Sequence, residues 1–197
     1  MFTVVLDEIA RLREPGRRLL IGVSGPPGAG KSTLAEGIVS RLGEAVAVPM
    51  DGFHLANPEL RRLGLAHIKG APETFDAAGY VALLRRIKER PPGIVYAPSF
   101  DHVMNEPIAG SIPVPAETQV VVTEGNYLLV WPGARELFDL TVHIDTDPDS
   151  RIAGLIARQR AKGLTEEAAV EWVMRSDEAN ARLVGEFAHL ATLQLRR

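Results

Sequence analysis

The most constraining feature of this chain is the glycine-rich stretch GVSGPPGAGKST at residues 22–33. It overlaps the short apolar run LLIGV, which is typical of a strand, and it leads into a helical pattern over residues 32–42. Gly28 and Gly30 are positions where the backbone can take positive φ. Such a loop turns backbone amides inward ahead of a helix N-terminus, and this arrangement binds anions. The stretch therefore predicts a strand, a phosphate-binding loop and a helix in that order.

The loop also matches the motif G-x-x-x-x-G-K-[ST] at each fixed position, from Gly25 to Ser32. In this motif the amides surround the phosphates of a nucleotide, the lysine reaches the outer phosphates, and the hydroxyl coordinates Mg²⁺. The alternative is a flexible turn with a chance lysine, which would not need a strand before it and a helix after it. We therefore predict ATP and Mg²⁺ as cofactors, Lys31 as a catalytic residue, and nucleotide binding by Gly25, Gly28, Ala29, Gly30, Lys31, Ser32 and Thr33.

Several classes of protein share this loop. The chain contains no N-K-x-D tetrapeptide for guanine recognition and no LSGGQ-like transporter signature, which favours a small-molecule kinase. These motifs leave the preference between ATP and GTP open, and they leave the oligomeric state open.

The remainder of the chain alternates between strand and helix patterns. We expect helices over residues 2–12, 76–90, 148–162 and 166–190, and strands over 45–49, 120–123 and 140–144. We also expect an extended piece that starts at residues 93–96, a hairpin or edge excursion in the proline-spaced segment 108–117, and an edge strand in the final TLQLRR. Strands that alternate with helices predict one α/β domain over residues 1–197 with a mostly parallel, doubly wound sheet. Ligands of such sheets bind at the carboxyl ends of the strands.

Composition excludes several classes of partner. The net charge is −3, so no overall positive field would attract nucleic acid or an anionic membrane, and small-molecule partners are favoured. The absence of cysteine excludes thiolate catalysis and disulfides. Asp7 and Glu8 stand where a signal peptide would be apolar, and no uncharged stretch has the length of a membrane span. We therefore expect a cytoplasmic protein without membrane insertion.

Two carboxylates follow predicted strands. Asp51 comes after the second strand and could accept the proton of a substrate hydroxyl, although an Asp before glycine is by itself more typical of a turn cap. Glu124 comes directly after VVVT and, with Ser32, could hold Mg²⁺, or it could cap a turn.

A basic helix face follows the segment Asp145–Arg151. Arg151, Arg158 and Lys162 share one face of the predicted helix, whereas Arg160 points elsewhere. Such a face could neutralise charge on a transferring phosphoryl group, or it could be a solvated surface.

Together these pieces resemble the uridine kinase, phosphoribulokinase and bacterial pantothenate kinase group of P-loop kinases. DGFH at residues 51–54 resembles T-D-G-F of pantothenate kinases, and KGAPETFD at 69–76 is similar to their K-G-F-P-E-S-Y-D. APSFDH at 97–102 resembles A-P-x-Y-S-H, and Glu124-Gly125 matches the E-G that ends the family's Walker B strand. DTDPDSR at 145–151 resembles the entry to the uridine kinase lid.

The resemblance implies a three-layer P-loop NTPase fold with a helical lid over about residues 148–165. It implies that Asp51 is the catalytic base and that Asp76 and His102 bind the acceptor. Arg151 is assigned to the nucleotide and Arg158 to catalysis. Three further residues are expected at the acceptor: Phe53, His54 and Tyr96.

The departures from the family pattern bear on the acceptor and the lid. Gly154 and Leu155 occupy the positions of an arginine pair in uridine kinases, so Arg158 or Arg160 must supply the charge. The base-recognising segment of uridine kinases and the C-terminal pantothenate region are both missing. The chain is most similar to short bacterial proteins labelled fructose transport system kinase, which implies a sugar acceptor. Uridine or pantothenate kinase activity, a non-catalytic ATP-binding regulator of sugar transport and a simple ATPase remain alternatives.

The other aromatic and histidine residues fit packing roles. We expect Trp131, Trp172, His143 and His189 to be structural. Asp177 and Asn180 lie three residues apart on the last long helix, where they could reach the nucleotide or the lid, or simply be polar surface residues.

Overall fold

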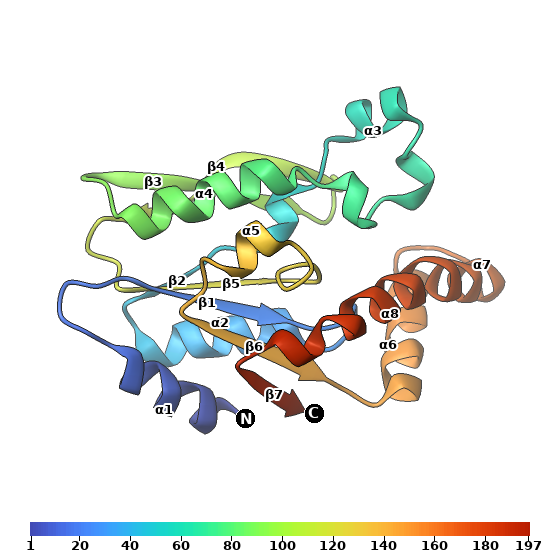
Figure 1. Cartoon of the computed structure of the whole chain (residues 1–197). Coiled ribbons are helices and arrows are strands. Elements are labelled where there is room, and N and C mark those ends of the chain that lie inside the picture. The colour runs from blue at the N-terminus through green and yellow to red at the C-terminus, as the bar shows by residue number, and fades with distance from the viewer.

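A five-stranded parallel sheet forms the centre of the computed structural model, which describes all 197 residues (Figure 1). The strands have the order β2-β5-β1-β6-β7, and every neighbouring pair is parallel. This confirms the predicted α/β class and the predicted C-terminal edge strand. The strand bounds are β1 (Leu19–Ser24), β2 (Ala45–Ala47), β5 (Val120–Gly125), β6 (Leu140–Asp145) and β7 (Leu193–Arg196).

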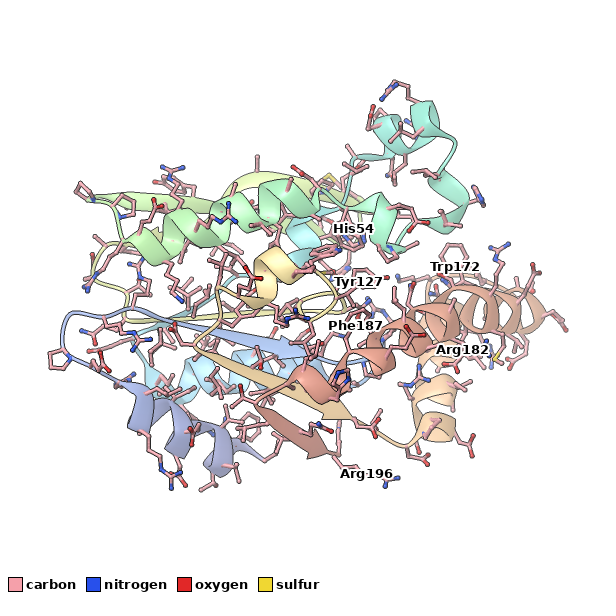
Figure 2. The ribbon with its side chains drawn as sticks, in the orientation of Figure 1. His54, Tyr127, Trp172, Arg182, Phe187 and Arg196 are labelled. Carbon is pink, nitrogen blue, oxygen red and sulfur yellow. The ribbon has the colours of Figure 1, made fainter.

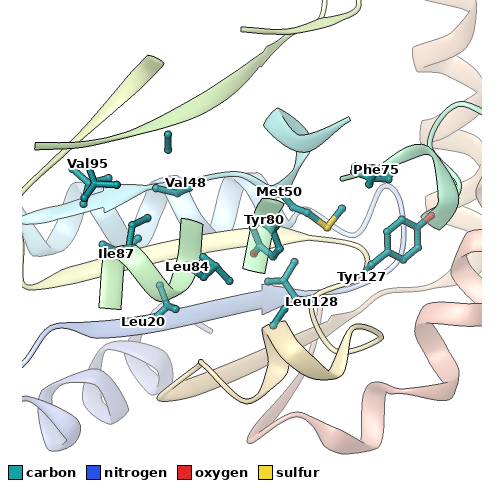
Figure 3. Close-up of a cluster of buried hydrophobic side chains, with 14 of the residues drawn as sticks. Leu20, Val48, Met50, Phe75, Tyr80, Leu84, Ile87, Val95, Tyr127 and Leu128 are labelled. Atoms are coloured by element: carbon teal, nitrogen blue, oxygen red, sulfur yellow. The ribbon is translucent and has the colours of Figure 1, made fainter. Parts of the chain in front are cut away.

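Helices cover both faces of this sheet, because successive strand residues point to opposite faces. Ile21 and Val122 pack in one cluster with helices α1 (Phe2–Leu12) and α2 (Lys31–Leu42). Leu20 and Val121 pack in another cluster with α4 (Ala77–Glu89), α5 (Pro132–Arg135) and α8 (Glu178–Glu186), and Figure 3 shows its centre. The predicted three-layer fold is therefore confirmed.

A separate antiparallel hairpin lies beside α4. It consists of β3 (Ile94–Asp101), which begins in the predicted extended piece, and β4 (Glu106–Pro115), which contains most of the proline-spaced segment. Helix α3 (Asn57–Leu63) and short 3₁₀ turns connect β2 to α4, and no sequence pattern predicted this part. In Figure 1 the hairpin and α3 lie on the same side of the central sheet.

The C-terminal helices project from one end of the sheet (Figure 1). They are α6 (Pro148–Ala161) and α7 (Glu166–Trp172), and a π-helical turn over Val173–Asp177 then joins α7 to α8. The predicted helical segment over residues 166–190 is confirmed in its extent, but it is not one regular α-helix: a π turn follows α7, and a short 3₁₀ turn over Ala188–Leu190 follows α8. None of the helices combines the length and the apolar character needed to span a membrane.

The predicted strand over residues 45–49 was too long. β2 has only three residues because it lies at the sheet edge, where β5 is its single partner. Val48 extends this contact by one hydrogen bond, from its N–H to the carbonyl of Val122 at 2.8 Å. The chain then turns at Pro49, so Asp51 falls at the carboxyl end of the strand.

Candidate active site

The glycine-rich loop follows β1 and precedes α2, as the motif requires. Gly28 and Gly30 have φ of 80° and 91°, in the left-handed region that the sequence predicted. Gly25 is needed for a different reason: a side chain there would lie 2.5 Å from the carbonyl oxygen of Ile144 on β6. The loop is thus held close to the neighbouring strand, and the N-terminus of α2 lies directly behind it.

Lys31 is buried at the start of α2. Its Nζ donates a hydrogen bond to the carbonyl of Pro26 at 3.0 Å, and no carboxylate oxygen lies within 4.0 Å of it. Burial lowers the pKa of Lys31, while the nearby charges of Glu124 and Asp51 oppose that shift. An ammonium carries three donors, so two remain for an anion at the loop.

Ser32 and Glu124 meet at the same edge of the sheet, because β1 and β5 are parallel neighbours. The Ser32 hydroxyl donates to Glu124 Oε1 at 3.0 Å. Burial raises the pKa of Glu124, and the charge of Lys31 partly offsets this. A hydroxyl and a carboxylate with oxygens this close fit Mg²⁺, which is usually held by one or two protein ligands together with phosphate oxygens and water.

Asp51 lies in the 3₁₀ turn Met50–Phe53, next to His54. The Nδ1 of His54 donates to the backbone carbonyl of Asp51 at 2.8 Å, since a carbonyl can only accept. The imidazole stacks on Phe75 and Phe100, with ring centroids 4.0 and 4.7 Å apart. Burial lowers the pKa of His54, so the ring is neutral near pH 7 and its Nε2 can accept a hydrogen bond.

A cavity of about 1060 Å³ brings these groups together. We call its sides the loop wall, the helix wall and the hairpin wall. The loop wall is formed by residues 27, 28 and 30–33 with Glu124, and the helix wall by lining residues between 155 and 180. The hairpin wall is formed by Asp51, His54, Asn57, Lys69, Phe100, His102, Val103 and Asn105.

Ten of the predicted site residues line this cavity. They come from all three walls: Gly28, Gly30, Lys31, Ser32, Thr33, Asp51, His54, His102, Glu124 and Arg158. Ala29 instead lines a smaller cavity of about 230 Å³ on the other side of the loop, which shares Gly30 and Thr33 with the large one.

Four predicted residues have other contacts. Phe53 packs edge-on against Tyr80 at a centroid distance of 5.3 Å. Asp76 caps α4, where it accepts from the N–H of Gly79 at 2.8 Å. The side chain of Tyr96 lies on the outer face of β3, opposite the buried Val95 and Ala97, and is 55% exposed. The structure therefore does not bring these three side chains to the cavity. The fourth residue, Arg151, forms an ion pair with Glu178.

The basic residues of α6 are divided as the helical spacing predicted. Arg158 lines the cavity with Lys162, whereas Arg160 points away and pairs with Glu166 at 2.8 Å. Arg151 is buried against the loop, where it forms an ion pair with Glu178 and donates to the carbonyl of Pro27.

The π turn and the adjoining helix ends supply cavity residues that the sequence did not predict, or for which it left two roles open. Trp172, which we expected to be structural, lines the cavity. Figure 2 shows Trp172 on α7 and His54 on the segment that follows β2, and both residues line the cavity. Asp177 also lines it, with a buried Oδ2 that has no hydrogen-bond partner and with its pKa raised by burial. A π turn has no clear sequence signal, so only the spacing of Asp177 and Asn180 pointed here.

The backbone carbonyl of Gly70, a residue that lines the cavity, accepts two hydrogen bonds. Gly70 accepts from the Tyr127 hydroxyl at 2.5 Å and from Asn180 Nδ2 at 3.2 Å, which ties three segments together. Trp131 packs against Phe75 and Tyr127, which confirms its structural role. Asn57, Lys69 and Asn105 of the hairpin wall had no predicted role, although Lys69 begins the KGAPETFD segment.

A phosphate-binding loop with a buried lysine, facing an aspartate across one cavity, defines the class of P-loop phosphotransferases. The model of the Phosphoribulokinase / Uridine kinase family matches residues 20–189, and the chain belongs to that family. It is therefore a kinase with a hydroxyl acceptor, and kinases of this family use ATP.

Three relatives are informative. A Schizosaccharomyces pombe protein named "Putative uridine kinase C227.14" is 36% identical over 184 residues, which cover 85% of this chain and 78% of the relative. The Escherichia coli protein YggC, named as uncharacterized, is 34% identical over 180 residues, covering 86% and 74%. A crystal structure from Silicibacter sp. TM1040, titled "putative fructose transport system kinase", is 35% identical, covers 98% of both chains and has a TM-score of 0.89. These names point to different acceptors.

Proposed function

We propose that this kinase transfers the γ-phosphoryl group of ATP to a hydroxyl of a small sugar-like or nucleoside-like acceptor, with Mg²⁺ as cofactor. The observation that carries the proposal is that Lys31 of the loop wall and Asp51 of the hairpin wall line the same cavity. This cavity is larger than a triphosphate needs, and its hairpin wall carries polar side chains that a phosphate site alone does not require.

The loop wall would hold the donor. The amides of residues 28–33 and the ammonium of Lys31 bind the phosphates, and the N-terminus of α2 favours their charge. Ser32 and Glu124 would hold Mg²⁺, which neutralises phosphate charge when bound. The smaller cavity beside Ala29 contains Leu34 and Ile144, so it suits the flat apolar faces of the nucleotide base.

The hairpin wall would hold the acceptor. Asp51 takes the proton from the acceptor hydroxyl as its oxygen forms a bond to the γ-phosphorus. The bond from that phosphorus to the β–γ bridging oxygen breaks, and ADP leaves. His54 Nε2 accepts a hydrogen bond from a second acceptor hydroxyl, and His102 lies beside it. Arg158 neutralises the charge that spreads over the transferred group.

Residues 148–165 would act as a lid within a single 1–197 domain. The first half of α6 is anchored, because Leu155 packs against Gly28 of the loop. Arg158 in the second half and Lys162 directly after it both line the cavity. Neither forms a salt bridge, and the carboxylate whose charge acts on both is that of Asp177. A short rotation of this half would bring both cations onto bound phosphates.

The uridine and fructose names of two relatives make these compounds the first acceptors to test. A non-catalytic regulator of sugar transport is disfavoured because it would need neither Asp51 nor the polar hairpin wall. Pantothenate remains a third acceptor for the panel.

An acceptor panel with Asp51→Asn tests the proposal. Wild-type protein should release ADP from MgATP faster with one acceptor than without any, and Asp51→Asn should reduce that rate by about 10²- to 10⁴-fold with nucleotide binding unchanged. Asp7→Asn, an exposed change on α1, is the matched control. If Asp51→Asn kept full acceptor-dependent turnover, Asp51 would not be the base.

A further inference from the structure

Lys69 is a fixed cation on the hairpin wall. Its Nζ donates to Asn57 Oδ1 and to the carbonyl of Asn105, both at 2.6 Å. The amide of Asn57 is itself held, because its Nδ2 donates to the same Asn105 carbonyl at 3.1 Å. The ammonium also lies 5.3 Å from the centroid of the Phe100 ring. These contacts aim the side chain along the cavity surface, and they leave one of its three donors free.

Lys69 forms no ion pair. Both hydrogen-bond partners are neutral, and no carboxylate oxygen lies within 4.0 Å. Glu106 is the only acidic group that affects it, but both oxygens of Glu106 accept from the backbone N–H of Asn57. Burial lowers the pKa of Lys69, as expected for an ammonium that lacks an anionic partner. An anion would fit here.

Lys69 is separate from the cations that serve the phosphates. The Nζ of Lys31 is held in the loop by the carbonyl of Pro26, whereas the Nζ of Lys69 is held by Asn57 and Asn105 on the hairpin wall. The triphosphate therefore has its own lysine and its own arginine on the loop and helix walls. Lys69 is left for a second anionic group.

Lys69 is instead connected to the proposed base. The Nδ1 of His54 donates to the backbone carbonyl of Asp51, and its ring stacks on Phe100 at a centroid distance of 4.7 Å. The Lys69 ammonium lies 5.3 Å from the centroid of the same Phe100 ring, so the His54 and Phe100 rings connect Asp51 to Lys69. A molecule whose hydroxyl reaches Asp51 can therefore extend past the His54 ring to Lys69. His102 lies beside this path, with its ring 5.3 Å from that of Phe100.

We infer that the acceptor carries an anionic group, a carboxylate or a phosphate, and that Lys69 binds this group at the far end of the hairpin wall from Asp51. This rests on the proposed function, since it specifies the acceptor of the same site. It predicts a sugar acid or a sugar phosphate in preference to the neutral sugar. Asn57 and Asn105 position the ammonium, and His54 binds a hydroxyl between the two ends.

Matched acceptors test this inference. Ribose, ribonate and ribose 5-phosphate share a skeleton and differ in charge, and the glucose and glycerol series provide two further sets. Binding is measured by calorimetry with the protein saturated with Mg²⁺ and a non-hydrolysable ATP analogue, and turnover by ADP release. Wild-type protein should bind and phosphorylate an acid or a phosphate ester more tightly than the neutral member. Comparing the two anionic members identifies which group is the natural one.

Variants of Lys69 separate charge recognition from structure. Lys69→Met keeps the length of the side chain and should weaken binding of the anionic member about 10- to 100-fold, with the neutral member unchanged. Lys69→Arg should recover part of the loss. Arg61→Met is the control, because Arg61 is exposed on α3 and does not line the cavity.

The outcomes distinguish this inference from the proposed function. Absence of MgATP binding or of any Asp51-dependent turnover would refute both. Kinase activity with equal preference for neutral and anionic members would refute only the anionic acceptor. Failure of the wild type to bind any anionic member would also refute the anionic acceptor. A Lys69→Met effect of the same size on neutral and anionic members would refute it as well, because it would show that Lys69 only holds the wall together.

Discussion

The loop wall and the hairpin wall are built in opposite ways. The loop wall comes from one continuous stretch, residues 27–33, with Glu124 added by a neighbouring strand of the same sheet. The hairpin wall collects side chains from a 3₁₀ turn, α3, the loop before α4 and the β3–β4 turn, which are up to about fifty residues apart in sequence. The first depends on local backbone geometry and the second on long-range packing.

Under the proposed function, this difference would allow the acceptor side to change while the donor side stays the same. The loop wall is attached to the central sheet, so a change there would disturb β1 and α2. The hairpin forms its own two-stranded sheet outside the central one. Its turn at Asn105 can therefore vary in length and charge while the fold remains intact.

Lys31→Met should have the largest effect and should affect every acceptor equally. Removing the ammonium that reaches the outer phosphates should reduce kcat/KM by about 10³-fold. The melting temperature should stay the same or rise, because Lys31 is buried without a carboxylate partner. Arg41→Met, on the exposed side of the same helix, is the control. A selective loss for one acceptor would contradict the separation between the two walls.

Arg158→Gln should have the next largest effect. It tests whether the helix wall serves the phosphoryl group, like the loop wall, or the acceptor, like the hairpin wall. Arg158 lines the cavity, so its loss should lower kcat by about 10²-fold with the acceptor KM unchanged, if it serves the transferred phosphoryl group. Arg160→Gln is the internal control, since Arg160 forms an exposed pair with Glu166 that contributes less than about 1 kcal/mol to stability. Equal losses in the two variants would contradict the assignment.

The loop wall could be predicted from sequence because each requirement is local. Positive φ at Gly28 and Gly30 and the lysine at the helix start follow from consecutive residues, and the parallel strands follow from short apolar runs. Glu124 and Asp51 could be placed because both stand at the carboxyl ends of strands, and parallel strands end at one edge of a sheet.

The hairpin wall could be predicted only in part because its residues depend on tertiary contacts. Tyr96 was expected at the acceptor, but successive side chains of β3 point to opposite faces, and that of Tyr96 points outward. Asp76 was expected at the acceptor, yet a helix N-cap competes for the same carboxylate. Lys69 reaches the cavity only because α3 and the β3–β4 turn meet beside it. Nothing local in the sequence indicates such a meeting.

The smallest expected effect concerns two histidines, the half-buried His54 and the buried His143, one near each wall. Burial lowers the pKa of both His54, on the hairpin wall, and His143, on β6 beside the loop. The unfolded chain binds these protons at about pH 6.5, whereas the folded chain resists them to lower pH. Both groups therefore favour the folded state above pH 6.5, and this contribution is lost as the pH falls through the lowered pKa values.

His143→Leu and His54→Asn should each reduce the loss of melting temperature between about pH 7.5 and about pH 5, because each removes one group of lowered pKa that must otherwise gain a proton. They should differ in activity. His143 does not line the cavity, so His143→Leu should leave kcat/KM unchanged. His54→Asn keeps a donor for the Asp51 carbonyl but lacks Nε2, so it should raise the acceptor KM with the KM for ATP unchanged. If His54→Asn raised the KM for ATP instead, the ring would belong to the donor side, and the division between the two walls would have to be redrawn at His54.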